Sequence, residues 1–429
     1  MLFTSFVWSS DDFGRGRYDF LNSTFNVVGD VFQPKAVILS APDAASLGAP
    51  VAGERNYARV IDPAAGASFA LPTGFDGLIA GGRNAVTLTA STPGALLIGN
   101  AGRSTLTTTG AGSTLVAGTE GTSMRAQGGG DTFYGGGGND SMAGGGTFFT
   151  GAGNNLVSLD GTGSVVRAEG RDTIFMGLAG PANDTIGATA FSKGTVVFAG
   201  AGRLTFINAD APSTVTGGIG GSATIFGGTG GGIFQGGSAG NNRLISGSGI
   251  LPEVHFPGGS YFTFVNVFTP PNPVGYGTVT LIGGGDGDLL YANGFGQNIL
   301  MAGPGNSTLI GGQQAGGSVF VGAFGTAATT VTGGNDADII FAGTGSLVAD
   351  GGDGVDLFVF TADRPGGATI INGFNTGQDR LALLGHDPGE AVRALAAAQV
   401  ADGSTTLTLV DNTRITFTGV SDLSSGVFI

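Results

Sequence analysis

A short glycine cluster recurs about every nine residues between Gly77 and Phe360, and it constrains the fold more than any other feature of the chain. Each unit reads as glycines, one or two polar residues and then a few apolar residues. Such a unit is too short to bury its own apolar side chain, but stacked units build a continuous thin core. Glycine supplies 86 of the 429 residues and disfavours long helices, because each interior glycine costs about 1 kcal/mol relative to alanine. The sequence therefore predicts an all-β fold, a parallel β-solenoid (β-roll or β-helix) of glycine-rich repeats.

Composition excludes several classes of function. The net charge is −14 and only two lysines occur, so no basic footprint for nucleic acid is present. The absence of cysteine rules out disulfides and thiolate metal sites. No apolar run is long enough to predict a membrane span, and the first twenty residues do not form a standard signal peptide. Export, if it occurs, is expected to use another route.

Two units match the nonapeptide G-G-x-G-x-D-x-U-x at every defined position, namely Gly135–Ala143 (GGGGNDSMA) and Gly351–Val359 (GGDGVDLFV). Gly283–Tyr291 and Gly333–Phe341 depart from it only by aspartate at the fourth position. In this pattern the glycines are expected to take positive φ in a turn. The turn carbonyls and the aspartate then offer the hard oxygen ligands that Ca²⁺ prefers. The apolar U residue points inward, and two units make one coil of about 18 residues.

On these motifs the chain resembles the RTX, or haemolysin-type calcium-binding, repeat proteins. The resemblance implies a protein of a Gram-negative bacterium whose C-terminal region is read by a type I secretion channel. It also implies an extracellular or cell-surface location, which would account for the missing N-terminal signal.

The sharpest site prediction concerns Asp338 and Asp356, which are 18 residues, or one coil, apart. Their carboxylates are expected to stack on one edge and to share a Ca²⁺ ion with carbonyl groups of the turns 333–336 and 351–354. Asp140 and Asp288 are two further candidates, although the residues one coil away from them are uncharged. The predicted metal ligands are Asp338, Asp356, Asp336, Gly333, Gly351 and Asp353, with Asp140 and Asp288 as those further candidates.

Many units lack the acidic residue at the position that would bind the ion. They carry Ser104, Gly232, Asn242, Asn298 and Ser307 instead. Most coils are therefore expected to be held by apolar stacking and backbone hydrogen bonds, with phenylalanines such as Phe234 and Phe358 pointing into the core.

The rhythm of the repeats divides the chain into three regions. Residues 1–75 are expected to form a mixed β capping region, and residues 76–360 the solenoid, with an aromatic insertion at 251–277 that either protrudes as a partner surface or packs on the flank. Residues 361–429 are expected to form a C-terminal cap and secretion-signal region. This small β domain contains one short helix, with Asp387 as its N-cap and its end near Val400. Strands Thr405–Val410 and Thr413–Val420 follow as a hairpin.

Catalytic motifs are absent from the sequence or isolated. No H-E-x-x-H occurs, and the two histidines, His255 and His386, lie in different regions. The one G-x-S-x-G string, Gly236–Gly240, lies inside a repeat rather than at a strand-to-helix elbow. We therefore expect no enzymatic activity.

The expected function is that of a calcium-binding structural or interaction protein, acting in adhesion, extracellular matrix or a surface layer, whose partners are a cell-surface glycan or further copies of itself. Two alternatives stay open: a polysaccharide-active β-helix enzyme, and a solenoid that binds ice or glycan through the threonines of Thr87–Thr92 and Thr105–Thr109. A flat row of outward threonines favours the binding module, whereas a cleft with converging carboxylates favours the enzyme.

Overall fold

The computed structural model describes residues 36–41, 47–160, 163–177, 183–209, 211–228, 232–246, 254–255, 261–262, 279–292, 297–311, 317–362 and 367–429. The chain divides into two compact units, residues 1–197 and 198–429. Each unit is a parallel β-solenoid, so the predicted fold class is confirmed.

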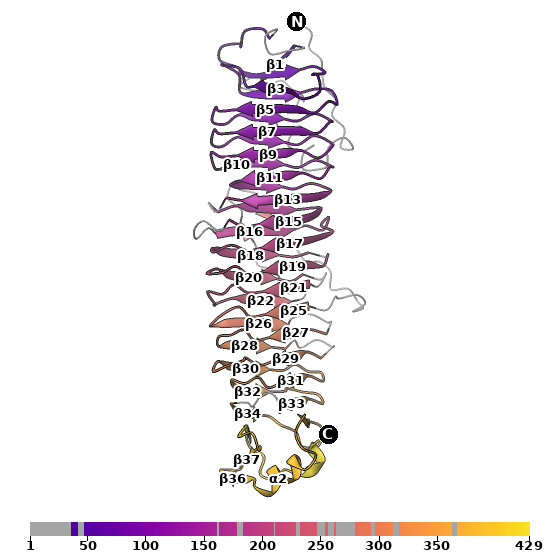
Figure 1. Ribbon diagram of the computed structural model, residues 1–429, viewed down its shortest axis with the longest axis vertical. Coiled ribbons are helices and arrows are strands. Elements are labelled where there is room, and N and C mark those ends of the chain that lie inside the picture. The colour runs from indigo at the N-terminus through magenta and orange to yellow at the C-terminus, as the bar shows by residue number, and fades with distance from the viewer. Residues whose placement is uncertain are drawn as a thin grey trace. The chain divides into compact units, whose positions relative to one another are not determined.

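Unit 1 contains two parallel sheets whose strands alternate along the chain (Figure 1). Each strand pairs in register with a strand of the neighbouring coil. Sheet A consists of β1 (Ala36–Ala41), β2 (Arg55–Val60), β4 (Gly77–Ala80), β6 (Leu96–Ile98), β8 (Thr114–Val116), β10 (Asp131–Tyr134), β12 (Gly146–Phe149), β14 (Val165–Ala168) and β16 (Asn183–Ala188). Sheet B consists of β3 (Ala67–Ala70), β5 (Val86–Ala90), β7 (Ser104–Thr108), β9 (Ser123–Ala126), β11 (Ser141–Gly144), β13 (Asn154–Leu159) and β15 (Arg171–Phe175), and β17 (Gly194–Phe198) follows at the unit boundary.

Unit 2 repeats this arrangement of two parallel sheets (Figure 1). The parallel strands of its sheet A are β18 (Arg203–Ile207), β20 (Ser222–Phe226), β22 (Arg243–Ser246), β26 (Asp288–Ala292), β28 (Ser307–Ile310), β30 (Ala328–Thr332), β32 (Ser346–Asp350), β34 (Ala368–Asn372) and β38 (Arg414–Phe417), and two antiparallel strands, described below, join the same sheet at its C-terminal end. Its sheet B consists of β19 (Ser213–Thr216), β21 (Gly232–Gln235), β25 (Val279–Ile282), β27 (Ile299–Met301), β29 (Val319–Val321), β31 (Ile339–Phe341), β33 (Leu357–Thr361) and β35 (Arg380–Leu384).

The predicted insertion at 251–277 contains one antiparallel pair, β23 (Val254–His255) with β24 (Tyr261–Phe262). The rest of the insertion lies outside the described residues, as do both of its predicted roles.

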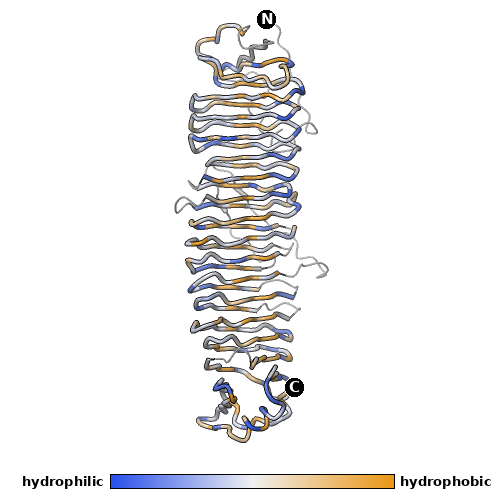
Figure 2. The backbone as a smooth tube through the Cα atoms, in the orientation of Figure 1, coloured by the Kyte–Doolittle hydropathy of each residue, from blue (hydrophilic) through white to orange (hydrophobic). Residues whose placement is uncertain are grey.

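The core contains columns of apolar side chains that stack in register, with one side chain from each strand in a column, and some strands bury further apolar residues beside them. Hydrophobic residues recur along the coils (Figure 2), and in strands such as β5, β7 and β9 every second side chain is buried, as the alternation of side chains in a β-strand requires. In unit 1 the two inward columns are Leu78, Leu97, Leu115, Phe133, Phe148, Val166 and Ile186 in sheet A, and Leu88, Leu106, Met124, Met142, Val157 and Ile174 in sheet B. Burial of each such side chain stabilises the fold by about 1.5–3 kcal/mol.

Phenylalanine contributes to these columns as the sequence predicts, although not exclusively. Phe234 and Phe358 are 0% and 1% exposed. Inside unit 1, the rings of Phe133 and Phe148 stack with centroids 4.3 Å apart. Phe175, in contrast, ends β15 on the outer face and is 43% exposed, so phenylalanine is not confined to the core.

The turn glycines are needed for close approach at least as much as for backbone conformation. Gly352 and Gly354 have the expected positive φ, +87° and +123°. None of the four glycines that open the unit Gly135–Ala143 does, so the expectation of positive φ is wrong there. A Cβ on Gly135 would lie 1.8 Å from the carbonyl oxygen of Thr150 in the next coil. Only glycine allows the backbones of successive turns to lie this close.

Solenoid pairing extends on both sides of the glycine-rich region. β2 and β3, within residues 1–75, pair in parallel with β4 and β5. Beyond residue 360, β34 and β35 pair in parallel with β32 and β33, and β38 adds a further parallel strand beside β34.

The C-terminal region contains the predicted hairpin and a shorter helix than expected. β37 (Ser404–Thr408) and β38 pair antiparallel, with Thr405 opposite Phe417, which confirms the hairpin. The helix α2 spans Glu390–Ala396, and its N-cap position is Gly389 rather than Asp387. The prediction that it reaches Val400 is wrong, because Val400 lies in β36 (Gln399–Ala401) and pairs with Thr405. A short 3₁₀ helix, η2 (Ser425–Val427), follows. Among the described residues, no helix has the length and apolar character needed to cross a membrane.

Candidate functional site

Buried polar side chains form a ladder at the edge where each sheet B strand begins. The register places these residues opposite one another in successive coils, and all are at most 6% exposed. We call them the sheet B ladder. It comprises Ser104, Thr122, Asp140, Asn155 and Asp172 in unit 1, and Asn298, Ser318, Asp338, Asp356 and Asp379 in unit 2.

Asp140 and Asp338 of the ladder each join two coils, because each of their two carboxylate oxygens accepts a backbone N–H group. One oxygen of Asp140 accepts the N–H of Thr122 in the preceding coil at 2.7 Å, and the other accepts the N–H of Gly136 in its own turn at 2.7 Å. Asp338 accepts the N–H groups of Ser318 and Gly334 in the same way, at 2.5 and 2.8 Å. Buried N–H groups require partners, so this arrangement explains why the repeat places a short carboxylate after the glycines.

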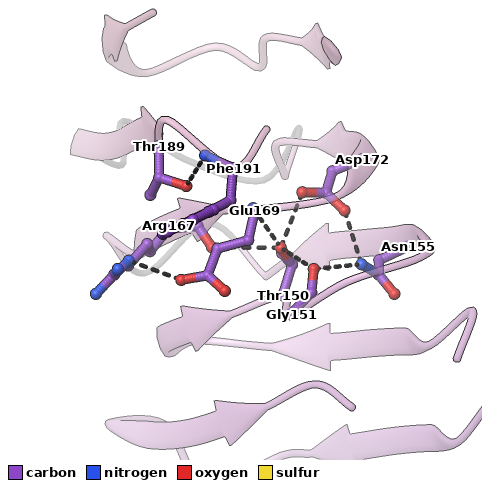
Figure 3. A network of polar contacts seen from close by, with 8 residues as sticks. All are labelled: Thr150, Gly151, Asn155, Arg167, Glu169, Asp172, Thr189 and Phe191. Carbon is purple, nitrogen blue, oxygen red and sulfur yellow. Dashed lines mark hydrogen bonds and ion pairs between the residues drawn. The ribbon is translucent and has the colours of Figure 1, made fainter. Parts of the chain in front are cut away.

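In unit 1 the ladder widens into a network around Asp172 (Figure 3). Its two carboxylate oxygens accept hydrogen bonds from the amide of Asn155 and the hydroxyl of Thr150, each at 2.8 Å. The Thr150 hydroxyl in turn accepts the N–H of Glu169, whose carboxylate pairs with Arg167 at 3.0 Å. Burial raises the pKa of Asp172 to about 6, although these hydrogen bonds favour the ionised form.

In unit 2 the ladder becomes a stack of three consecutive aspartates, Asp338, Asp356 and Asp379. Asp356 accepts the N–H of Asp338 at 2.9 Å, and Asp379 accepts the N–H of Asp356 at 3.0 Å. Neighbouring coils lie about 4.8 Å apart, so three carboxylates follow one another at that spacing.

One oxygen of this stack, Oδ2 of Asp356, is buried and has no hydrogen-bond partner among the described residues. In the preceding coil, the Oδ2 atom of Asp338 is capped by the N–H of the residue four positions earlier, Gly334. The equivalent N–H for Asp356 belongs to Gly352. Gly352 donates instead to Asp350 Oδ1 at 3.1 Å. Burial, together with the negative charges of Asp379, Asp338 and Asp350, raises the pKa of Asp356 to about 7, although the hydrogen bond from the Asp338 N–H lowers it. Asp356 therefore lacks one neutralising partner.

The structure brings together part of the predicted calcium site. Asp338 and Asp356 lie on the same edge in adjacent coils, as expected. Gly333 and Gly351 lie beneath the two carboxylates, since a Cβ on either would lie 2.7 or 2.1 Å from the Oδ2 atom of the aspartate in its own unit.

The remaining predicted ligands do not belong to this stack, although the charge of Asp336 acts on Asp338. Asp353 is exposed in its turn, and Asp336 is half-buried. Asp140 caps its turn in unit 1, and in unit 2 Asp288 of the sheet A edge accepts the N–H of Asn242 at 2.9 Å. Within the described ranges, no three His, Asp or Glu side chains are grouped closely enough to hold a metal ion.

A second ladder follows the edge where sheet A strands begin, with Ser113, Asp131, Ser164 and Asp184 in unit 1 and Asn242, Asp288 and Ser307 in unit 2. Asp131 and Asp184 accept the N–H groups of Ser113 and Ser164 at 2.7 and 2.6 Å. Burial raises the pKa of both, and each retains one buried oxygen without a partner among the described residues.

Among the ladder aspartates that the nonapeptide pattern misses are Asp131, Asp172 and Asp379. Each nevertheless lies in the shorter pattern G-x-D-x-U, as in Gly170–Ile174 and Gly377–Leu381. That five-residue fragment is enough for the ladder, because it supplies the carboxylate and the inward apolar residue two positions later.

Comparison of the chain with protein-family models and with curated proteins finds no match.

Proposed function

We propose that this protein is a calcium-binding structural or interaction protein that works outside the cell and has no catalytic activity. The observation that carries the proposal is the aspartate stack of unit 2. Three buried carboxylates at coil spacing repel one another, and Asp356 has an oxygen with no partner among the described residues. Burial of like charges is costly unless a cation or a proton neutralises them.

The residues of this stack fit Ca²⁺ in their chemistry. Carboxylates and turn carbonyls are the oxygen ligands that Ca²⁺ takes, and Asp338, Asp356 and the turns 333–336 and 351–354 would hold the ion. Bound there, Ca²⁺ would supply the charge that the Asp356 carboxylate lacks and tie two coils together. Since metal binding adds to folding free energy, the expected stabilisation is RT ln(1 + [Ca]/Kd), or about 2.7 kcal/mol at a hundredfold excess over Kd.

Charge is also concentrated in this half of the chain. Residues 198–429 contain 16 acidic and 6 basic residues, a net charge of −10, against −4 for residues 1–197. A cation-dependent role is therefore better supported for unit 2 than for unit 1.

The serine of the G-x-S-x-G string has a structural role that supports the non-catalytic proposal. Ser238 lies in a turn, and its hydroxyl accepts the N–H of Gly220 in the adjacent turn at 2.8 Å. His386 pairs only loosely with Asp411, at 4.0 Å.

Hydrogen exchange of the full chain, with Ca²⁺ or with EGTA, tests the calcium proposal. Ca²⁺ should slow exchange in β31 and β33, and Asp356→Asn should abolish this protection. Asp172→Asn is the matched control, since it removes a buried ladder carboxylate in unit 1 and should leave the effect of Ca²⁺ unchanged. Equal exchange with Ca²⁺ and EGTA throughout unit 2 would show that the ladder is purely structural and the calcium assignment wrong.

The extracellular location rests on the resemblance of the C-terminal region to RTX proteins. We propose that residues 361–429 act as a type I secretion signal as well as a cap. Fusion of this segment to a reporter protein in a bacterium with a type I exporter tests this, and a reporter retained in the cell would contradict it.

A further inference from the structure

The outer face of sheet B in unit 1 bears a straight row of hydroxyl groups. The register aligns Ser68, Thr87, Thr105, Ser123 and Ser141 on five consecutive coils, from β3 to β11. Adjacent strands are about 4.8 Å apart, so the five hydroxyls repeat at that interval. All point away from the core, because the row alternates with buried residues in β5, β7, β9 and β11, and Ser68 of β3 is exposed.

A shallow groove of about 330 Å³ lies over the middle of this row. Thr87, Thr105 and Ser123 line it, and so does Arg103 from the turn before β7. Gly66 and Gly121 also line the groove, where they add no side chain to fill it. The groove is open to solvent rather than enclosed, so a ligand there would lie along the face of the sheet.

The polar groups in this groove are available to a ligand. In the part of the chain that the structure describes, neither the hydroxyls of Thr87, Thr105 and Ser123 nor the guanidinium of Arg103 has a hydrogen-bond or ion-pair partner. The hydroxyls both donate and accept, whereas the guanidinium only donates and prefers a carboxylate. The backbone N–H and C=O groups of these strands already pair with adjacent coils, so a partner must be recognised through side chains.

Hydroxyl rows are not a necessary property of a solenoid face. At corresponding outward positions of sheet B, unit 2 carries Ile299, Val319 and Ile339. The row in unit 1 is thus a local feature of the sequence, together with Arg103 at its side.

We propose that this groove binds a linear polysaccharide with acidic sugars, which lies along the stack of strands. A polymer whose hydroxyls recur along its length meets equivalent hydroxyls on successive coils, and several weak contacts made at once add up to useful affinity. Arg103 selects a chain with carboxylates over a neutral one. None of the aspartates proposed to bind calcium lines the groove, so this inference stands apart from the calcium proposal.

Calorimetric titration of the full chain with hexagalacturonate, in EGTA, tests the inference, with maltohexaose as the neutral probe. The wild type should bind the acidic oligosaccharide more tightly. Thr105→Val preserves the branched shape and removes one hydroxyl, which should weaken binding about three- to tenfold. Arg103→Gln should weaken binding of the acidic probe about tenfold and reduce its preference over maltohexaose.

Two matched variants serve as controls. Thr173→Val alters an outward threonine of the same sheet, on β15, and Arg171→Gln removes an exposed arginine at the start of that strand. Both should bind hexagalacturonate as the wild type does.

Three results would overturn the inference: no saturable binding at millimolar hexagalacturonate, equal affinity for both probes, or equal losses in the groove and control variants. Shaping of ice crystals by a wild-type protein that binds neither saccharide, lost in Thr105→Val, would assign the hydroxyl row to ice instead.

Discussion

Replacement of Asp172 by asparagine should reduce the dependence of local stability on pH in the coils around β13 and β15. Asp172 is 1% exposed, and burial raises its pKa from 3.8 to about 6. The folded state therefore holds the Asp172 proton more tightly than the unfolded chain does. Its stabilising contribution is full below about pH 4 and is lost as the pH rises through about 6.

The size of this effect follows from the shift of the pKa. A rise from 3.8 to about 6 corresponds to about 3 kcal/mol of stability lost between acid and neutral pH. Asparagine has nearly the same shape and keeps an oxygen for the amide of Asn155. The Thr150 hydroxyl, which lies 3.3 Å from the carbonyl oxygen of Arg167, can donate its proton there instead. Asp172→Asn should thus stabilise these coils at pH 8, by up to about 3 kcal/mol, and have little effect at pH 4.

Hydrogen exchange is the appropriate assay, because a solenoid opens locally and a single global free energy of unfolding is not defined. Exchange in β13 and β15 is compared between wild type and variant at the same pH, so that intrinsic rates cancel. Glu120→Gln, which removes an exposed carboxylate of unit 1, controls for net charge. A difference between wild type and Asp172→Asn that is the same at pH 4 and at pH 8 would refute the reasoning.

Three further substitutions test the packing and capping described above. Phe133→Ala should destabilise its coil by about 3–5 kcal/mol, because the ring is fully buried, and exchange in β10 would report it. Gly135→Ala should be at least as damaging, since its Cβ would lie 1.8 Å from a backbone oxygen of the next coil, and wild-type expression and melting would contradict this. Glu390→Ala should lower the stability of the C-terminal region by about 1–3 kcal/mol, because the carboxylate accepts the N–H of Val410 at 2.7 Å. Exchange at Val410 would show the loss, and Glu390→Gln, which keeps an acceptor, should be milder.

The local sequence pattern was sufficient to predict the class of fold and which residues point into its core. A period of about nine residues, with glycines before each apolar position, specifies short strands and tight turns wherever it occurs. It therefore placed Phe234 and Phe358 inside, and it put Asp338 and Asp356 on one edge. The alternation around Asp411 and Asn412 likewise predicted the C-terminal hairpin. These features depend on neighbours within one or two coils, which the sequence displays directly.

The pairing of polar groups between adjacent coils could not be predicted from the sequence, because the number of residues that separates paired groups varies from coil to coil. Asp338 caps the N–H of a residue 20 positions earlier, Ser318, whereas Asp140 caps the N–H of a residue 18 positions earlier, Thr122. This drift hides which residues of successive coils lie opposite one another in unit 2, whereas the constant interval of 18 residues from Thr87 to Ser141 leaves the alignment of the hydroxyl row visible in the sequence. The unpartnered oxygen of Asp356 results from a competition for one N–H group, which no local pattern records. Sequence thus determined the coil, and tertiary structure decided how the polar groups of adjacent coils are paired or left free.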